Sequence, residues 1–237
     1  MDSILSLTGV TKSYGGVVPA LNNVHLEIPK GRIVGLLGPN GSGKTTFLKL
    51  CAGLLTANTG EIKICGLPVG PATKEMVSYL PDRTYLRSNQ TIREQLNFFM
   101  DFYKDFDYRR AEEMLSRLGI DPNARFGSLS KGTKEKVQLV LVMSRRAKLY
   151  LLDEPIGGVD PAARDYILNT IVTNYDPEAT VIISTHLISD VEPVLDEFIF
   201  LFQGNVIRTG TVDSAREEAQ KSLDELFREV FRCLPNY

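Results

Sequence analysis

A glycine-rich segment after a short apolar run carries the most specific chemical signal in the sequence. Residues 38–46 read GPNGSGKTT and match the pattern GxxxxGK followed by Ser or Thr. Glycine lets a backbone wrap around a phosphate chain so that successive N–H groups point inward. Lys44 adds a mobile charge for the β and γ phosphates, and the Thr45 hydroxyl can ligate Mg²⁺. The residues that we expect to contact a nucleoside triphosphate are Gly38, Pro39, Asn40, Gly41, Ser42, Gly43, Lys44, Thr45 and Thr46.

Two adjacent carboxylates follow a second apolar run, in the sequence LYLLDEP over residues 149–155. Successive side chains of a strand point to opposite faces, so Asp153 and Glu154 cannot share one role. We assign Asp153 to Mg²⁺, directly or through a coordinated water, and Glu154 to the attacking water as its general base. A charged pair at a strand end is unremarkable in isolation, but a phosphate-binding loop in the same chain favours a catalytic role.

A third segment, LSKGTKEK over residues 129–136, places Ser130 and Gly132 where a helix is expected to begin. The first N–H groups of a helix are unpaired and carry a partial positive charge, so such a start suits an incoming anion. An ordinary helix cap is the alternative, because Ser is a common capping residue.

The order of these motifs resembles the nucleotide-binding subunits of the ATP-binding cassette (ABC) family over about residues 3–212. Residues 38–46 look like the Walker A loop and residues 149–155 like Walker B. LSKGT at 129–133 is similar to the family signature LSGGQ, and GGVD at 157–160 to the D-loop. His186 in STH resembles the switch histidine, and Tyr14 stands where the family places an aromatic ring that stacks on adenine.

The resemblance implies an ATPase that works as a head-to-tail dimer around two MgATP molecules. The signature triad, Ser130, Lys131 and Gly132, would face the ATP that the second subunit holds. His186 would contact the γ phosphate, and Asp160 would contact nucleotide or cap the following helix. Hydrolysis to ADP and phosphate would drive a separate integral membrane permease. We therefore expect a homodimer or heterodimer in the cytoplasm, peripheral on the inner face of the cell membrane through that permease.

Three positions depart from the family pattern. Thr133 replaces the usual Gln of the signature. Lys131 replaces a Gly of the signature, and its ammonium either adds charge near the γ phosphate or stays in water. Asp82, in YLPD at 79–82, stands where family members often have Gln. Its carboxylate either reaches Mg²⁺, directly or through water, or belongs to an ordinary loop. YLPD and LSKGT favour export-type systems by analogy.

The elements that must position these residues alternate between strands and helices. Apolar runs predict strands over residues 4–12, 23–28, 33–37, 61–65, 149–152, 180–184 and 198–202. Helical patterns cover residues 45–54, 92–103, 108–118 and 161–173, and a further helix follows Leu129. The fold class is α/β: a P-loop NTPase core with a mainly parallel sheet, an N-terminal antiparallel β portion and an α-helical insert at about 82–148. We expect an ABC ATPase domain over residues 1–212 and a helical extension over 213–237.

Composition limits the partners. The net charge is −2, with no long basic block, so the sequence gives no electrostatic reason to expect nucleic acid. No apolar run reaches the roughly 18 residues that a membrane span requires, and we expect no direct membrane insertion. Cys51, Cys65 and Cys233 show no CxxC spacing, which indicates neither a disulfide framework nor a zinc site.

Two surfaces leave alternatives open. The apolar face of the helix that starts near Ser222 either packs on its own subunit or makes a dimer or regulatory contact. Near residues 82–99, Tyr85, Leu86, Phe98 and Phe99 either receive a short helix of the permease or belong to the core of the insert.

The alternative function is a soluble ABC-type ATPase that acts as an ATP-gated clamp in translation or DNA maintenance. Such proteins generally carry paired cassettes or a long coiled-coil insertion, and the sequence has neither. A GTPase or small-molecule kinase on the same loop would lack the guanine-reading NKxD and leave LSKGT without a role.

Overall fold

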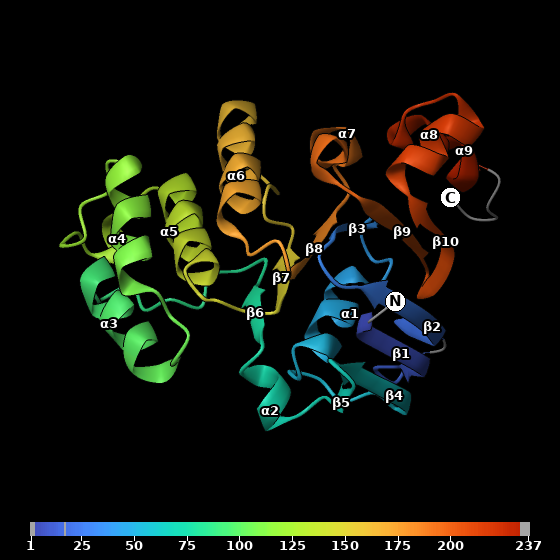
Figure 1. The fold of residues 1–237 in the computed structure, drawn as a ribbon, viewed down its shortest axis with the longest axis horizontal. Coiled ribbons are helices and arrows are strands. Elements are labelled where there is room, and N and C mark those ends of the chain that lie inside the picture. Colours follow the sequence, from blue (N-terminus) through green and yellow to red (C-terminus); the bar gives the residue numbers. More distant parts are fainter. Residues whose placement is uncertain (1–2, 17, 233–237) are drawn as a thin grey trace.

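Two sheets with one helix between them form the centre of the computed structural model, which describes residues 3–16 and 18–232 (Figure 1). The first sheet is antiparallel, in the order β2-β1-β4-β5. Its strands are β1 (Ser3–Lys12), β2 (Leu21–Pro29), β4 (Thr59–Ile64) and β5 (Leu67–Pro68). Helix α1 (Lys44–Cys51) packs between this sheet and the second one. The expected N-terminal antiparallel portion is confirmed.

The second sheet has the order β10-β9-β3-β8-β7-β6 and is parallel except for the pair β9 and β10. Its strands are β3 (Ile33–Leu37), β6 (Val77–Leu80), β7 (Leu149–Asp153), β8 (Thr180–Thr185), β9 (Glu197–Phe202) and β10 (Asn205–Thr211). All residues of β3, β7 and β8 are buried, as expected for parallel strands that are covered on both faces.

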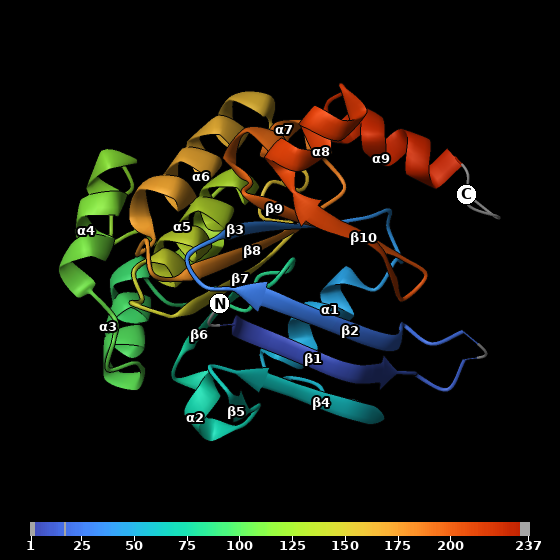
Figure 2. The same cartoon turned by 45° about the vertical axis from the view of Figure 1, so that its right-hand side comes forward.

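Alternate residues of the buried strands face different cores. Val34 and Leu36 of β3 belong to the cluster around α1, whereas Ile33 and Leu37 belong to the cluster under the helices of the opposite face. These helices include α6 (Pro161–Asn174), the short α7 (Ile188–Val191), α8 (Val212–Ala219) and α9 (Leu223–Arg232). Figure 2 shows them above the second sheet, with the first sheet below it. The strand period of two therefore builds a layered molecule.

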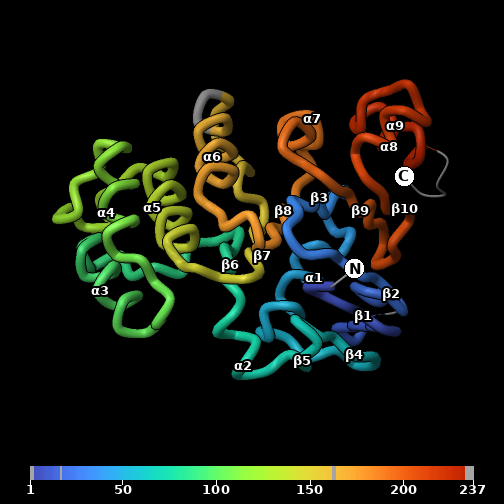
Figure 3. The backbone as a smooth tube through the Cα atoms, in the orientation of Figure 1, coloured from blue at the N-terminus to red at the C-terminus, as the bar shows by residue number. Residues whose placement is uncertain are grey.

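The helical insert joins two strands that lie side by side. The tube in Figure 3 follows the chain from β6 through α3 (Ile92–Phe102), α4 (Tyr108–Arg117) and α5 (Lys131–Met143) back to β7. Thr91 and Glu94 form the predicted capping box of α3: the Thr91 N–H donates to Glu94 at 2.7 Å, and the Glu94 N–H donates to the Thr91 hydroxyl at 3.2 Å. The exact insert boundaries, 82 and 148, stay a prediction.

Arg145, just after α5, fastens the insert to the second sheet. Its guanidinium is buried and pairs with both carboxylate oxygens of Asp105 at 3.0 Å. It also donates to the Val77 carbonyl at the start of β6, at 2.5 Å, and to the Glu75 carbonyl at 2.7 Å. The ring centroid of Tyr103 lies 3.9 Å away. One side chain thus connects the end of α5, the start of β6 and the loop after α3.

The C-terminal helices pack on their own subunit. Leu223, Leu226, Phe227 and Phe231 of α9 are buried in the core cluster that also holds Phe200 of β9. The ring centroids of Phe200 and Phe227 are 5.2 Å apart in an edge-to-face arrangement. The first alternative for this helix is therefore confirmed. The division between residues 1–212 and 213–237 stays a prediction.

Several element boundaries differ from the sequence expectation. Strands β6 and β10 and the one-turn helix α2 (Pro71–Lys74) were not predicted; β6 has four residues, too few for a periodic signal, and β10 lies at a sheet edge without a continuous apolar run. Helix α1 ends at Cys51 rather than residue 54, because Gly53 adopts φ +66 just beyond it. Among the described helices, none is long and apolar enough to cross a membrane.

Candidate nucleotide site

The loop between β3 and α1 is shaped by its glycines. Gly43 has φ +109, and a Cβ at this residue would lie 2.3 Å from the Ala20 carbonyl oxygen. A side chain at position 43 would therefore force the loop away from the first sheet. The Lys44 ammonium folds back over the loop and donates to the carbonyls of Gly38 at 2.7 Å and Pro39 at 3.2 Å. Walker A thus forms the curved loop that the motif predicts.

The loop leaves polar groups that suit a phosphate chain. The Ser42 side chain is 3% exposed, and its Oγ has no hydrogen-bond partner in the described part of the chain. An unpaired buried hydroxyl costs roughly 1–3 kcal/mol, so a ligand oxygen would relieve that cost. Burial lowers the pKa of Lys44, and the Glu154 carboxylate opposes the shift. The residues present therefore fit a triphosphate.

Asp153 lies at the centre of a group of hydroxyls. Its Oδ1 accepts from Ser184 Oγ at 2.8 Å and from Thr45 Oγ1 at 3.1 Å, and its Oδ2 accepts from the Tyr79 hydroxyl at 3.4 Å. Burial raises the pKa of Asp153, an effect that the Ser184 and Thr45 hydrogen bonds oppose. A hydroxyl and a carboxylate at this distance are the oxygen donors that Mg²⁺ uses beside a nucleotide. Thr45 and Asp153 therefore fit the ion.

The Glu154 carboxylate contacts other groups than Asp153 does, but strand alternation is not the reason, because Glu154 lies beyond the end of β7. It follows β7 with φ +50, and its N–H donates to the carbonyl and the hydroxyl of Ser184, both at 3.1 Å. One carboxylate oxygen lies 3.4 Å from Lys44 Nζ, and the other lies 3.2 Å from His186 Nδ1. The structure thus brings Lys44, Glu154 and His186 together from three separate segments.

Strand order explains why these segments meet. In the second sheet β8 lies between β3 and β7, and all three run parallel. Their carboxyl ends therefore share one edge, where Walker A follows β3, Asp153 ends β7 and His186 follows β8. Sequence reasoning did not assign Ser184 or Tyr79 a role, although both lie inside the quoted motifs STH and YLPD.

Tyr14 stands beside the start of α1. Its ring is 63% exposed, and its hydroxyl oxygen lies 3.3 Å from Thr46 Oγ1. The Lys12 ammonium lies 5.4 Å from the ring centroid. An exposed ring next to the phosphate loop is available for stacking on a base, which is the role predicted for this residue.

The signature triad lies apart from Walker A in the single chain. Ser130 caps α5, as predicted, and accepts from the Thr133 N–H at 3.2 Å. Lys131 is 76% exposed, and its ammonium lies 3.8 Å from Glu135 and close to Gly158 of the D-loop, 3.0 Å from where a Cβ there would stand. Among the described residues, no hydrogen bond or ion pair joins the triad to residues 38–46.

Asp160 and Asp82 lie at two sides of these groups. Asp160 is exposed at the start of α6, where its carbonyl accepts from the Arg164 N–H at 3.1 Å. Asp82 is 41% exposed and lies 4.0 Å from Arg83. Its charge contributes, after burial, to the raised pKa values of Asp153 and Tyr79, so it lies near the proposed metal ligands without a direct bond to them.

A groove of about 780 Å³ opens between the core and the insert. Its aromatic lining residues are Tyr79, Tyr85, Phe102 and Tyr103. Its charged lining residues are the three cations Lys49, Lys74 and Arg83 and the single carboxylate Glu75. Leu54, at one side, is largely exposed. The groove is therefore mainly apolar, and the cations among its lining residues outnumber the carboxylate.

Of the residues predicted to receive a permease helix, only Tyr85 lines the groove. Phe99 is 5% exposed and belongs to the core of the insert, where it contacts Tyr103 and Phe106. Leu86 also packs against that core. Phe98 is exposed and stacks on Phe102. The helical period accounts for the difference, because Phe98 and Phe102 share one face of α3 and Phe99 turns inward.

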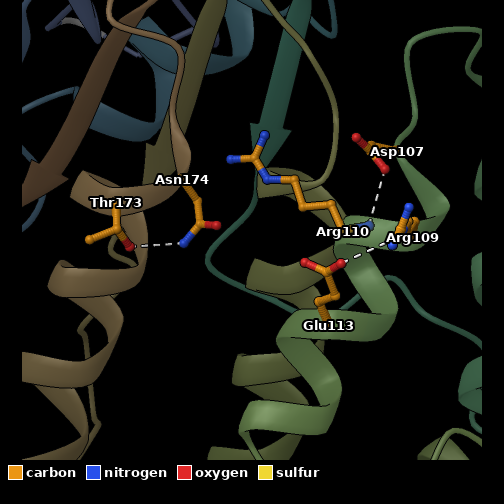
Figure 4. Close-up of a pocket in the computed structure, with 6 residues that line it drawn as sticks. All are labelled: Asp107, Arg109, Arg110, Glu113, Thr173 and Asn174. Carbon is orange, nitrogen blue, oxygen red and sulfur yellow. Dashed lines mark hydrogen bonds and ion pairs between the residues drawn. The ribbon is translucent and has the colours of Figure 1, made fainter.

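A polar cleft between α4 and the end of α6 lies away from the motifs (Figure 4). The Asp107 carboxylate accepts from the backbone N–H of Arg110 at 3.1 Å, and the Arg109 side chain pairs with Glu113 at 3.5 Å. It contains none of the predicted site residues.

Comparison with known proteins agrees with this geometry. A family model described as ABC transporter matches residues 21–157. The ABC transporter ATP-binding protein YtrB of Bacillus subtilis (strain 168) is 32% identical over 218 residues, 91% of this chain and 74% of that protein. The Nod factor export ATP-binding protein I of Rhizobium meliloti (strain 1021) is 31% identical over 215 residues, 87% of this chain and 64% of that protein.

Solved structures give the same result. The ATP-binding subunit of an ABC transporter superposes with a TM-score of 0.86 at 30% identity, over 97% of this chain and 100% of that chain. The cassette MJ0796, in a dimeric post-hydrolysis state bound to ADP and Pi, superposes with a TM-score of 0.77 at 24% identity, over 87% of this chain and 98% of that chain. This chain therefore belongs to the ABC transporter family and is the ATP-binding subunit of such a transporter.

Proposed function

We propose that this ATPase subunit works as half of a head-to-tail dimer that closes on two MgATP molecules and drives a separate membrane permease. The observation that carries the proposal is the separation of the signature triad from Walker A within one chain. Ser130 and Gly132 offer the start of a 13-residue helix, and no neighbouring atom would crowd a Cβ at Gly132. That open helix start is suited to a phosphate held by a second copy.

In each pocket one chain would bind the triphosphate, and the other chain would cover it with its signature triad. Gly38 to Thr46 cradle the phosphates through backbone N–H groups, Lys44 neutralises the terminal phosphoryl group, and Tyr14 stacks on the adenine. Thr45 and Asp153 would hold Mg²⁺, with Asp82 contributing through water. The ion would neutralise charge on the phosphate oxygens. Asp160 faces the same interface from the D-loop.

Glu154 is the general base in this proposal. Its carboxylate orients a water molecule toward the γ phosphorus and accepts a proton as the bond from phosphorus to the bridging oxygen breaks. His186 holds Glu154 on one side and the γ phosphoryl group on the other. The products, ADP and phosphate, no longer connect the two chains, because the phosphoryl group that the signature triad contacts has left.

Such a dimer is isologous: both copies use the same two surfaces, so the assembly closes with two-fold symmetry. The dimeric state of MJ0796 supports this arrangement for a chain with the same fold. A heterodimer with a second ABC subunit would use equivalent surfaces. The proposal needs no further component to complete the pockets.

The groove between the core and the insert is the proposed docking site for the permease. Tyr85 and Phe102 would receive the apolar face of a short cytoplasmic helix. The excess of Lys49, Lys74 and Arg83 over Glu75 favours a partner segment that carries acidic side chains. This contact would hold the subunit on the cytoplasmic face of the membrane. The similarity to a Nod factor export protein supports export as the direction of transport.

The dimer is tested by light scattering on the purified Glu154→Gln variant, with and without MgATP. We expect a monomer without nucleotide and a dimer with MgATP but not with MgADP. Ser130→Arg, which places a bulky side chain at the interface, should stay monomeric in both. A Glu154→Gln protein that remains monomeric at saturating MgATP would refute the dimer. The permease is tested separately, by copurification of an integral membrane protein with tagged wild-type subunit from detergent extracts; its absence would refute the transport partner.

A further inference from the structure

Arg164 connects two loops of the nucleotide site, the D-loop and the segment that follows His186. Its Nε donates to the Val159 carbonyl of the D-loop at 3.0 Å, and its Nη1 donates to Asp190 Oδ2 at 2.8 Å. Both side chains are partly buried, 24% exposed for Arg164 and 34% for Asp190. Partial burial makes this charge-assisted contact stronger than a surface ion pair.

The two ends of this connection face different parts of the site. Val159 precedes Asp160, and the D-loop also lies against the Lys131 ammonium of the signature triad. Asp190 lies in α7, the one-turn helix that begins two residues after His186. Ile188 and Val191 anchor α7 in the core, so a shift of Asp190 has to move the segment that carries His186.

We infer that Arg164 is a positioning residue that couples the two nucleotide sites of the dimer. The inference rests on the proposed function, in which the signature triad and D-loop of one chain meet the nucleotide of the second copy, while His186 meets the nucleotide of its own chain. A nucleotide bound by the second copy then displaces the D-loop, and Arg164 transmits the displacement through Asp190 to His186.

The geometry depends on the shape of the guanidinium. Its planar fork presents Nε and Nη1 to two acceptors on different elements at once, whereas the single ammonium of lysine cannot reproduce that arrangement. Lysine would keep the charge and the attraction to Asp190 and lose the fixed contact with the Val159 carbonyl. Arg164→Lys therefore separates charge from geometry.

A purely structural role would be to fasten α6 to α7. Loss of that contact would lower the melting temperature and the amount of active enzyme, but it would leave the shape of the ATP saturation curve unchanged. Coupling predicts the reverse pattern. The Hill coefficient for ATP hydrolysis can reach at most the number of coupled sites, about 2 in a symmetric dimer. Cutting the connection should decrease it, whereas closure of the dimer on two ATP molecules keeps it above 1.

The experiment measures ATP hydrolysis against ATP concentration for wild type, Arg164→Lys, Arg164→Ala, Asp190→Asn and the double variant Arg164→Ala with Asp190→Asn. Arg146→Ala is the matched control, because it removes another 2.9 Å ion pair, with Asp107, far from the D-loop. Binding of a fluorescent ATP analogue to the monomer should change less than about 2-fold in every variant. The Hill coefficient should fall in the four variants and not in the control, and the double variant should match the singles.

A wild-type Hill coefficient kept by folded Arg164→Lys and Asp190→Asn would overturn the inference. So would an equal loss of cooperativity in Arg146→Ala. Failure of the proposed function looks different, because wild type itself would then show no dimer with MgATP and no cooperativity. Where Arg164→Ala does not fold, the milder variants Arg164→Lys and Asp190→Asn decide the question.

Discussion

The carboxylate of Glu154 bridges Lys44 and His186, with one oxygen 3.4 Å from the ammonium and the other 3.2 Å from the imidazole. We predict that Glu154→Gln keeps nucleotide binding within a few-fold but lowers the hydrolysis rate by about 10²-fold or more, because a carboxamide cannot accept the proton. Steady-state release of phosphate and binding of a fluorescent ATP analogue give the two numbers. Unchanged hydrolysis would contradict the assigned role. Asp176→Asn, in the loop before β8, is a control that leaves the site intact.

Ser184 contacts both acidic residues: its Oγ donates to the Asp153 carboxylate at 2.8 Å and accepts from the backbone N–H of Glu154 at 3.1 Å. We predict that Ser184→Ala raises the Mg²⁺ concentration needed for half-maximal hydrolysis by about 10-fold, as for other residues that orient a metal ligand. Titration of activity with Mg²⁺ at fixed ATP measures the shift. Ser78→Ala, which removes a buried hydroxyl bonded to the Val142 carbonyl, should leave the Mg²⁺ dependence unchanged.

The Lys44 ammonium predicts how ATP affinity changes with pH. Burial lowers its pKa in the free protein, and bound phosphates would raise that pKa again because they favour the charged form. Binding is then strongest below the free-protein pKa and weakens as pH rises from that value toward the pKa of the complex. The dissociation constant of ATP, measured without Mg²⁺ from neutral to alkaline pH, should increase. The Lys44→Met variant should bind ATP weakly, and its dissociation constant should not increase with pH. The same increase in that variant would show that another group causes the pH dependence.

Lys131 gives a prediction about the dimer. If its ammonium leaves Glu135 and contacts the γ phosphate, Lys131→Gln should weaken the MgATP-driven dimer about 10-fold and reduce its sensitivity to salt. Lys136→Gln, further along α5, is the control. Dimer dissociation constants of the Glu154→Gln background at two salt concentrations test this. Equal dimer dissociation constants for the variants with and without Lys131 would contradict this contact and indicate that the ammonium stays in solvent.

Phe231 tests the C-terminal helices. Its ring is fully buried and lies 3.9 Å, centroid to centroid, from that of Phe227. Phe231→Ala should lower the free energy of unfolding by about 3–5 kcal/mol, the range for large aromatic deletions in a core. Phe98→Ala, at an exposed ring, should cost far less. Denaturant titration compares them, and similar losses would show that α9 contributes little to the core.

The sequence predicted the parts of the site that lie within contiguous motifs. Walker A, the pair Asp153 and Glu154, and the caps at Thr91 and Ser130 depend on neighbours a few residues away, so spacing reveals them. The contacts of Tyr79 and Ser184 with Asp153 depend on strand order, which spacing does not encode.

The sequence also did not predict the side-chain contacts between separate elements. Arg164 reaches Asp190 across 26 residues, and Arg145 reaches Val77 across 68. Neither belongs to a motif, and an arginine is most often exposed to solvent, so the sequence marks neither residue. The groove shows the same limit: a cluster of aromatic residues was visible, but the inward turn of Phe99 and the outward turn of Phe102 depended on how α3 packs.

The buried guanidinium of Arg145 fixes the insert to the second sheet. The same group contacts the Tyr103 ring, which lines the groove, the first residue of β6 and the Asp105 carboxylate. Helix α5 has 13 residues and is about 20 Å long, with Ser130 at its start and Arg145 just after its end. The residue that joins the groove lining to β6 and the cap of the signature helix therefore stand at opposite ends of one element.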